Sequence, residues 1–300
     1  LRRAPRGPRA PQPNTKVSLA FRPPFDWNAL LAFLRTRAVP GVEAIDDGCY
    51  RRTFATAGGA GVYQVALAPV GRALDLAVRG AEPVALLDIV SRVRRQFDLD
   101  ADPMAIAAAL GGTTLLAARV RARPGMRVPG AWDRFETLVR AVLGQQISVA
   151  AATTLCGRLV RLCGTPVSVE APLTHVFPTP AQVAAADLTA VGLPRFRAES
   201  LRGLAAAVAG DPALLEPAPS LDSLIERLCA LPGVGPWTAQ YAAMRAFNEP
   251  DAFPAGDLIL RRAAGDVSAR ALERLSQAWR PWRAYAALHL WTQHARGDAT

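Results

Sequence analysis

Residues 231–257 read LPGVGPWTAQYAAMRAFNEPDAFPAGD, and this stretch decides the fold of the chain. It follows a segment, 221–228, whose leucines and isoleucine recur at the three- and four-residue spacing of an amphipathic helix. Gly233 and Gly235 form a tight turn after that helix, and Pro236 stands at a first-turn position of the next one. Such a turn exposes backbone N–H groups at a helix N-terminus, where a phosphate can bind. The same residues would also suit an ordinary turn between two helices.

Helical periodicity extends over most of the chain around this stretch. Asp133 and Ser148 are candidate N-caps of two helices, separated by Gly144 and a polar break at Gln145-Gln146-Ile147. Helices are expected at 133–143, 149–163, 180–186, 196–209, 221–230, 236–247, 258–264, 269–279 and 281–295. We therefore predict an all-α region at 98–300.

The chain before residue 98 has the pattern of an α+β unit. Asp26 can cap a helix at 27–37, and apolar residues between 84 and 97 mark a second helix. An alternating run begins at Val17, and β-like runs follow at 42–45, 49–57, 62–68 and 73–78, with a natural hairpin turn at Gly58–Gly61. The prediction is a domain at 16–97 with a mainly antiparallel sheet and two helices.

Composition excludes several classes of protein. The 300 residues are 51% hydrophobic and 20% charged, which is enough for two or three packed cores and too apolar for a largely disordered chain. Arg, Gly or Pro interrupts every apolar run well before 18 residues, so neither a membrane span nor a signal peptide is expected. Four scattered cysteines without a CxxC pair suit a reducing, cytoplasmic setting, and three dispersed histidines predict no zinc site.

Positive charge is concentrated at the start of the chain. The formal net charge is +10, and residues 1–16 hold five cations and no acid, which leaves 30 cations and 25 acids in the rest. This modest basic bias is compatible with a polyanionic partner. Residues 1–15, rich in Pro and Arg and without periodicity, are predicted to be a flexible basic arm or linker. Lys16 is the only lysine, so a Schiff base has one side-chain candidate.

Four motifs together identify a family resemblance. The hairpin is followed by a Pro-containing loop and by Asp257 at the start of a helix. The other three are FRPPFDW at 21–27, a helix with LGQQ at 143–146, and WRPWRAYAALHLW at 279–291. In this order and spacing they resemble the helix-hairpin-helix DNA glycosylase superfamily, and within it the bacterial 3-methyladenine DNA glycosylase II family, from about residue 16 to 298. The resemblance implies two helical subdomains with the active cleft between them.

The resemblance assigns the catalytic carboxylate to Asp257. Cleavage of an N-glycosidic bond builds positive charge on the sugar, which a fixed carboxylate stabilises, and the same group can take a proton from the attacking water. A helix cap alone would also explain this aspartate. Asp251 is expected to be a loop or cap residue.

The resemblance also implies an aromatic pocket for a flipped base, made by Trp237, Tyr241 and Trp291. Alkylated purines are cationic, and electron-rich rings attract them. Trp291 also fits a helical core stripe. Relatives that cut the DNA backbone carry their Schiff-base lysine at the position of Trp237, so the implied enzyme is a monofunctional glycosylase, a hydrolase without lyase activity. A lyase-type glycosylase for oxidised bases is the third hypothesis.

DNA contacts are implied at Gln145, Gln146 and the hairpin residues Gly233, Val234 and Gly235. Gln146 stands where the family inserts a minor-groove wedge, although both glutamines could simply be solvated. Pro236 replaces a basic residue of the family, which removes one expected backbone contact. The family's hairpin carbonyls hold a monovalent cation, for which Leu231, Gly233 and Val234 are the candidate ligands; no other cofactor is implied.

The implied function is excision of alkylated bases from double-stranded DNA in base excision repair, by a nucleoid-associated bacterial monomer. A non-catalytic DNA-binding module in a repair assembly is the alternative. Whether 3-methyladenine, 7-methylguanine, deaminated purines or oxidised pyrimidines are preferred depends on the shape of the pocket. Relatives also fuse such a glycosylase behind an adaptive-response regulatory module, and the arm resembles a linker from it. We expect deletion of the arm to spare excision and to weaken DNA binding mainly at low salt.

Overall fold

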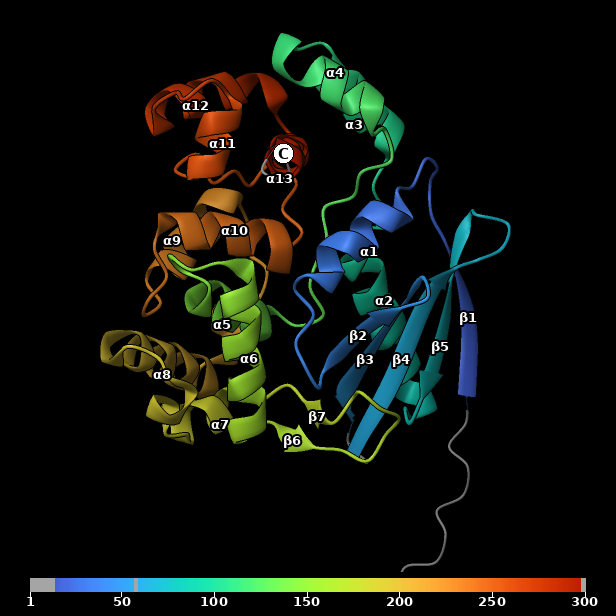
Figure 1. The fold of residues 1–300 in the computed structure, drawn as a ribbon, viewed down its shortest axis with the longest axis vertical. Helices are drawn as coiled ribbons and strands as arrows, with labels where there is room; N and C mark the ends of the chain where they lie inside the picture. Colours follow the sequence, from blue (N-terminus) through green and yellow to red (C-terminus); the bar gives the residue numbers. More distant parts are fainter. Residues whose placement is uncertain (1–13, 57–58, 298–300) are drawn as a thin grey trace, which may run out of the picture.

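The computed structural model describes residues 14–56 and 59–297 of the chain (Figure 1). Five strands form one antiparallel sheet in the order β1-β5-β4-β3-β2. They are β1 (Asn14–Ala20), β2 (Glu43–Asp46), β3 (Cys49–Thr56), β4 (Gly59–Leu67) and β5 (Ala73–Arg79). Helices α1 (Trp27–Arg35) and α2 (Leu86–Gln96), the latter after a short η1 (Pro83–Ala85), pack on one face of the sheet. The predicted antiparallel α+β unit is confirmed.

Two details of this unit differ from the prediction. Strand β1 begins at Asn14, so Asn14 and Thr15, expected in the arm, pair with β5, while residues 1–13 lie outside the described part. The expected turn at Gly58–Gly61 is wrong in its bounds, because Gly59, Ala60 and Gly61 belong to β4; residues 57–58 are outside the described part. Gly61 serves packing instead, since a Cβ there would lie 2.4 Å from the Phe54 ring.

The rest of the described chain is mainly helical, as predicted, but it is not all-α, because it contains one short antiparallel ribbon. Its helices are α3 (Pro103–Gly111), α4 (Thr114–Ala122), α5 (Arg134–Leu143), α6 (Val149–Cys163), α7 (Pro180–Ala185), α8 (Arg195–Gly210), α9 (Leu221–Cys229), α10 (Pro236–Ala246), α11 (Leu258–Ala263), α12 (Ala269–Ser276) and α13 (Arg283–Gly297). Short 3-10 turns are η2 (Leu188–Val191), η3 (Pro212–Leu215) and η4 (Gln277–Trp279), and a two-stranded ribbon joins β6 (Thr165–Pro166) to β7 (His175–Val176). Asp133 and Ser148 cap α5 and α6 as predicted. Within the described part of the chain, no helix combines the length and apolar character that crossing a membrane requires.

A buried ion network joins the sheet to the helical region. Arg52 on β3 pairs with Glu43 on β2 and, through two hydrogen bonds, with Glu136 on α5. Arg140, one turn further along α5, lies 3.1 Å from Glu43 and 3.0 Å from Glu136. Burial alone would raise the pKa of Glu43, but the two guanidiniums hold it below its ordinary value. The network fixes α5 against the sheet and so sets where α1 stands relative to the helices.

Candidate active site

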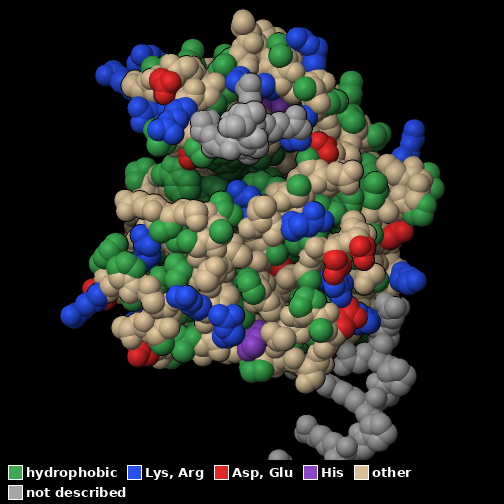
Figure 2. Space-filling model, in the orientation of Figure 1, with side chains coloured by type: hydrophobic (Ala, Val, Ile, Leu, Met, Phe, Trp, Pro, Cys, Tyr) green, Lys and Arg blue, Asp and Glu red, His purple; other side chains and the backbone are tan. Residues whose placement is uncertain are grey.

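A cavity of about 1010 Å³ lies where the α+β unit meets the helices. Helix α1, helix α5, helix α10, the loop before α11 and helix α13 all contribute to its wall. The residues that line it include Phe33, Arg37, Trp237, Tyr241, Asp257 and Trp291. On the face drawn in Figure 2, the surface is hollowed between the lobe of α11–α13 and the helices next to it, and hydrophobic side chains gather there.

The hairpin between α9 and α10 has the geometry that its glycines predict. Gly233 has a φ of +75°, and a Cβ there would lie 2.9 Å from the Cβ of Ser200. Gly235 is the N-cap of α10, and nothing lies within 4 Å of the position that its Cβ would take. The side chain of Val234 is buried, and its N–H donates to the Leu231 carbonyl at 3.1 Å. Gly233 and Gly235 are exposed, so their amides are among those that a phosphate can reach.

Asp257 is held from three sides at the wall of the cavity. As N-cap of α11, its Oδ1 accepts from the Leu260 N–H at 2.9 Å. The indole Nε1 of Trp291 donates to the same oxygen at 3.1 Å, and Nε1 of Trp237 donates to Oδ2 at 3.0 Å. The helix cap and a fixed, half-buried carboxylate in the cavity are therefore compatible in one residue. These indole donors are a second use of two residues that the sequence predicts only as stacking partners.

Asp251 is engaged elsewhere. Both of its oxygens accept from Arg283, at 2.7 and 3.0 Å, and Arg280 lies 3.5 Å away. It does not line the cavity. The two aspartates of the loop thus have different surroundings, and Asp257 is the one beside the aromatic residues.

The three predicted aromatic residues converge on the cavity, but in an uneven arrangement. The rings of Trp237 and Tyr241 stack on each other, with centroids 5.3 Å apart and planes 8° apart. Tyr241 and Trp291 are 6.4 Å apart at 60°. Because the first pair is already in contact, a base cannot lie between Trp237 and Tyr241. A base in this cavity would contact Tyr241 and Trp291, and Trp291 also packs against the core, as its helical spacing suggests.

The two glutamines of the break before α6 have different surroundings. Nε2 of Gln145 donates to the Gly233 carbonyl at 2.9 Å and to the Thr238 hydroxyl at 3.1 Å, so this residue ties the break to the hairpin. Gln146 is exposed, has a φ of +59°, and contributes to the cavity wall. It is therefore the freer of the two residues to meet DNA, and its role as a wedge stays a prediction.

The hairpin carbonyls are the type of ligand that the implied monovalent cation requires. The Leu231 oxygen accepts from Val234 and the Gly233 oxygen from Gln145, and each carbonyl keeps a second lone pair. These are neutral oxygen donors on one turn, which suits a singly charged ion. No group of three or more His, Cys, Asp or Glu side chains that could hold a metal ion occurs in the described ranges.

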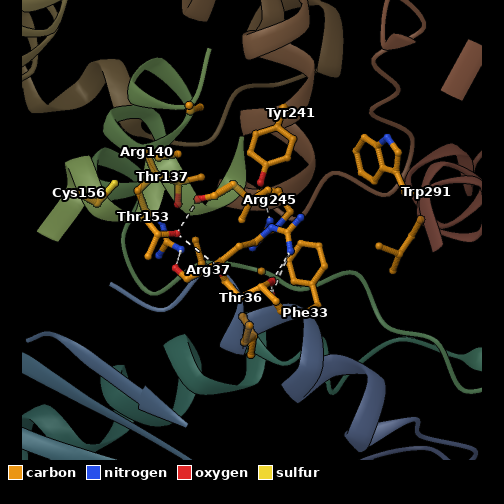
Figure 3. A pocket seen from close by; sticks show the side chains of 18 of the residues that line it. Phe33, Thr36, Arg37, Thr137, Arg140, Thr153, Cys156, Tyr241, Arg245 and Trp291 are labelled. Atoms are coloured by element: carbon orange, nitrogen blue, oxygen red, sulfur yellow. Dashed lines mark hydrogen bonds between the residues drawn. The ribbon is translucent and has the colours of Figure 1, made fainter. Parts of the chain in front are cut away.

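The inner part of the cavity, which Figure 3 shows, was not predicted from the sequence. Arg245 follows Tyr241 by one turn on α10, and its Nη1 donates to the Tyr241 hydroxyl at 2.7 Å. Phe33 and Arg37, from α1 and the residues after it, lie against them. The four-residue spacing of Trp237, Tyr241 and Arg245 is a signal that could have found Arg245. Nothing in the sequence motif connects α1 to the hairpin.

The lysine amine and the cysteine thiols are poor candidates for a nucleophile in this cavity. Lys16 is exposed on β1 and does not line the cavity. Cys156 does line it, but burial raises the pKa of its thiol to about 12 and that of Cys163 to about 11. Both thiols are therefore protonated near neutral pH, as expected of small buried hydrophobes.

Two family models match the chain. The model described as "AlkA N-terminal domain" matches residues 16–133, past the boundary predicted at 97. The model described as "HhH-GPD superfamily base excision DNA repair protein" matches residues 139–283.

Curated relatives match most of the chain. The probable bifunctional transcriptional activator/DNA repair enzyme AlkA of Mycobacterium tuberculosis is 42% identical over 92% of this chain and 56% of the relative. DNA-3-methyladenine glycosylase 2 of Escherichia coli is 38% identical over 91% of this chain and 96% of the relative. The chain thus spans about half the length of the first of these. A 3-methyladenine DNA-glycosylase from Archaeoglobus fulgidus shares the fold, with a TM-score of 0.80, 20% identity and coverage of 95% and 100%.

Proposed function

Because the chain belongs to the DNA-3-methyladenine glycosylase 2 family, we propose that it hydrolyses the N-glycosidic bond of alkylated bases in double-stranded DNA, as a step of base excision repair. The observation that carries the proposal is the Asp257 carboxylate, held by two indole N–H groups and a helix N-terminus beside a cavity that can take a base. A purely structural cap would not need the two indole donors.

The hairpin supports the binding half of the reaction. The exposed amides at Gly233 and Gly235, at the N-terminal end of α10, would bind a backbone phosphate next to the lesion. Gln146 would fill the gap in the stack when the base turns out of the helix. The base would enter the cavity against Tyr241 and Trp291. A cation bound by the hairpin carbonyls would add positive charge near the same phosphate.

Asp257 would act on the sugar. As the bond between C1′ and the base breaks, its electron pair leaves with the base and positive charge builds on the sugar ring. A carboxylate that cannot turn away stabilises this charge in a site with little water. Asp257 would then accept a proton from the water whose oxygen bonds to C1′.

We further propose that the enzyme is a monomeric, monofunctional glycosylase that leaves an abasic site. A lyase needs an amine to form a Schiff base with C1′, whereas Trp237 stands at the hairpin and Lys16 lies away from the cavity. Borohydride should therefore trap no covalent protein–DNA adduct under conditions in which base is released. A trapped adduct would support the lyase hypothesis instead.

The decisive experiment measures base release from duplexes with alkylated, deaminated and oxidised bases, by wild type, Asp257→Asn and Asp251→Asn. Asn caps a helix about as well as Asp, so Asp257→Asn should fold and bind DNA. It should lose roughly a hundredfold or more of the rate, which is about 2.7 kcal/mol of barrier. Asp251→Asn, the matched control, should keep the rate per folded molecule. A fully inactive wild type that still binds DNA would favour the alternative of a non-catalytic anchor.

A further inference from the structure

The inner end of the cavity carries positive charge without a counter-charge. Five arginines and three carboxylates line the whole cavity. Glu43 and Glu136 pair with Arg52 and Arg140, and Asp257 accepts from two indoles. Within the described ranges, neither Arg37 nor Arg245 forms an ion pair with a carboxylate.

These two guanidiniums share one aromatic neighbour, and we call the set of Arg37, Arg245 and the Phe33 ring the cationic floor. The Cζ atoms of Arg37 and Arg245 lie 3.8 and 4.8 Å from the centroid of the Phe33 ring. Arg37 donates through Nη1 to the Phe33 carbonyl at 3.2 Å and to the Thr36 hydroxyl at 2.9 Å. Figure 3 shows the hydroxyl end of Tyr241 turned toward Arg245, with Arg37 and Phe33 beside it.

The floor keeps hydrogen-bond donors for a ligand. Arg245 is 7% exposed; its Nε donates to the Pro129 carbonyl and its Nη1 to Tyr241. The Tyr241 hydroxyl is also a side-chain hydrogen-bond partner of Arg37. The Nη2 of Arg245 donates to no other residue in the described part of the chain, and both arginines line the cavity.

The protein compensates the burial of these two cations only with neutral groups, the rings of Phe33 and Tyr241 and a few oxygens. Removing a cation from water is unfavourable unless a negative or electron-rich partner replaces the water. Desolvation is the largest cause that lowers the pKa of both arginines, and Tyr241, which acts to raise both, offsets it only in part. A ligand with acceptor atoms would supply it.

We propose that the cationic floor recognises uncharged damaged bases through their carbonyl edge and stabilises the negative charge that such a base takes as it leaves. This inference rests on the proposed function. A cationic alkylated base departs neutral, because the electron pair of the broken bond cancels its charge. An uncharged 6-oxopurine departs as an anion, delocalised over its ring nitrogens and carbonyl, and takes a proton from water later. Only the second departure gains from two nearby cations.

The two ends of the cavity therefore suit different lesions. The aromatic faces of Tyr241 and Trp291 attract a cationic base, and the Asp257 carboxylate stabilises the sugar in both reactions. The floor repels a cationic base and assists an uncharged one. Arg37 is the residue to test, because it is half-buried, whereas Arg245 is buried.

The experiment compares single-turnover release of hypoxanthine and of 7-methylguanine from otherwise identical duplexes. The variants are Arg37→Gln, Arg37→Lys and, as matched control, Arg35→Gln, whose arginine is exposed at the end of α1 and does not line the cavity. Arg37→Gln should lower the ratio of the hypoxanthine rate to the 7-methylguanine rate about tenfold, Arg37→Lys should restore most of it, and Arg35→Gln should leave it unchanged.

The outcomes separate the two proposals. A wild type that releases neither base contradicts the proposed function. Two outcomes contradict only the proposed role of the cationic floor. One is a wild type that releases 7-methylguanine but not hypoxanthine, and the other is a rate ratio that changes less than threefold in Arg37→Gln. If Arg37→Gln does not fold, Thr36→Val, which removes one acceptor of Arg37, tests the same ratio. The ratio must then fall below that of the wild type, and an unchanged ratio overturns the floor.

Discussion

At the scale of single residues, the Asp257 carboxylate has little freedom to turn. Three N–H groups from three separate segments donate to its two oxygens. Hydrogen bonds to an ionised group are among the stronger ones in proteins, at roughly 1.5–3 kcal/mol each. Its orientation is therefore set before any DNA binds, which is what electrostatic stabilisation of a developing charge requires.

Removing one of these hydrogen-bond donors should show that the fixed orientation of the Asp257 carboxylate matters for the rate. Trp291→Phe keeps an aromatic ring in the cavity but removes the N–H that donates to Oδ1 of Asp257. We expect the single-turnover rate to fall about tenfold, with DNA affinity nearly unchanged. Trp282→Phe is the matched control, since Trp282 does not line the cavity. Equal rates for Trp291→Phe and the wild type would mean that the carboxylate is held without this indole.

At the scale of elements, the two glycines of the hairpin have different roles, one in folding and the other in binding. Gly233 needs its left-handed backbone and its closeness to Ser200, whereas Gly235 has ordinary dihedrals and open space around it. The first glycine is thus required by the folded chain itself. The second is required only if something approaches the N-terminus of α10.

The pair of alanine variants tests this division. Gly233→Ala should lower the free energy of unfolding by roughly 1–3 kcal/mol, through strain and the contact with Ser200. Gly235→Ala should cost less than about 1 kcal/mol but weaken DNA binding severalfold, because the new methyl group stands where a phosphate would bind. Chemical denaturation and titration with duplex DNA give the two quantities. Reversed effects would place the DNA contact at Gly233.

The elements that the sequence predicts are those with strong local signals. Capping residues such as Asp26, Asp133 and Ser148 mark helix starts that the structure confirms. Helices α3 and α4 were missed, because in their Ala-rich segments the small side chains give no clear apolar face. The cationic floor was missed for another reason: Arg37 meets Arg245 only through tertiary packing, which no local pattern encodes.

At the scale of the whole molecule, buried titratable groups away from the cavity affect stability in opposite directions. Burial raises the pKa of Asp98 to about 6, so its contribution to stability is lost as pH rises from about 4 to 6. His289 on α13 is buried, its Nδ1 has no partner among described residues, and Arg123 and Arg119 lie nearby. Burial, with these cations, lowers the pKa of His289 to about 4.

The sign of the histidine effect is testable. Between pH 6.5 and 4 the unfolded chain binds a proton at this residue and the folded chain does not, so stability is full above pH 6.5 and falls as pH decreases. The loss should approach roughly 3 kcal/mol near pH 4. His289→Gln should therefore show a flatter pH dependence of the urea midpoint between pH 4.5 and 7 than the wild type. Asp98 is unchanged in both proteins, so parallel curves would contradict the assignment.

The cationic floor also has a consequence for the order in which parts of the chain fold during synthesis. Arg37 and Arg245 are about 200 residues apart in the chain, and contacts of such long sequence separation form late in folding. During synthesis, the sheet domain can fold while Phe33 and Arg37 still have nothing to close against. The cavity is completed only when α10 has left the ribosome and docked. A chain that ends before α10 therefore lacks part of the cavity wall, and the cavity is not yet formed.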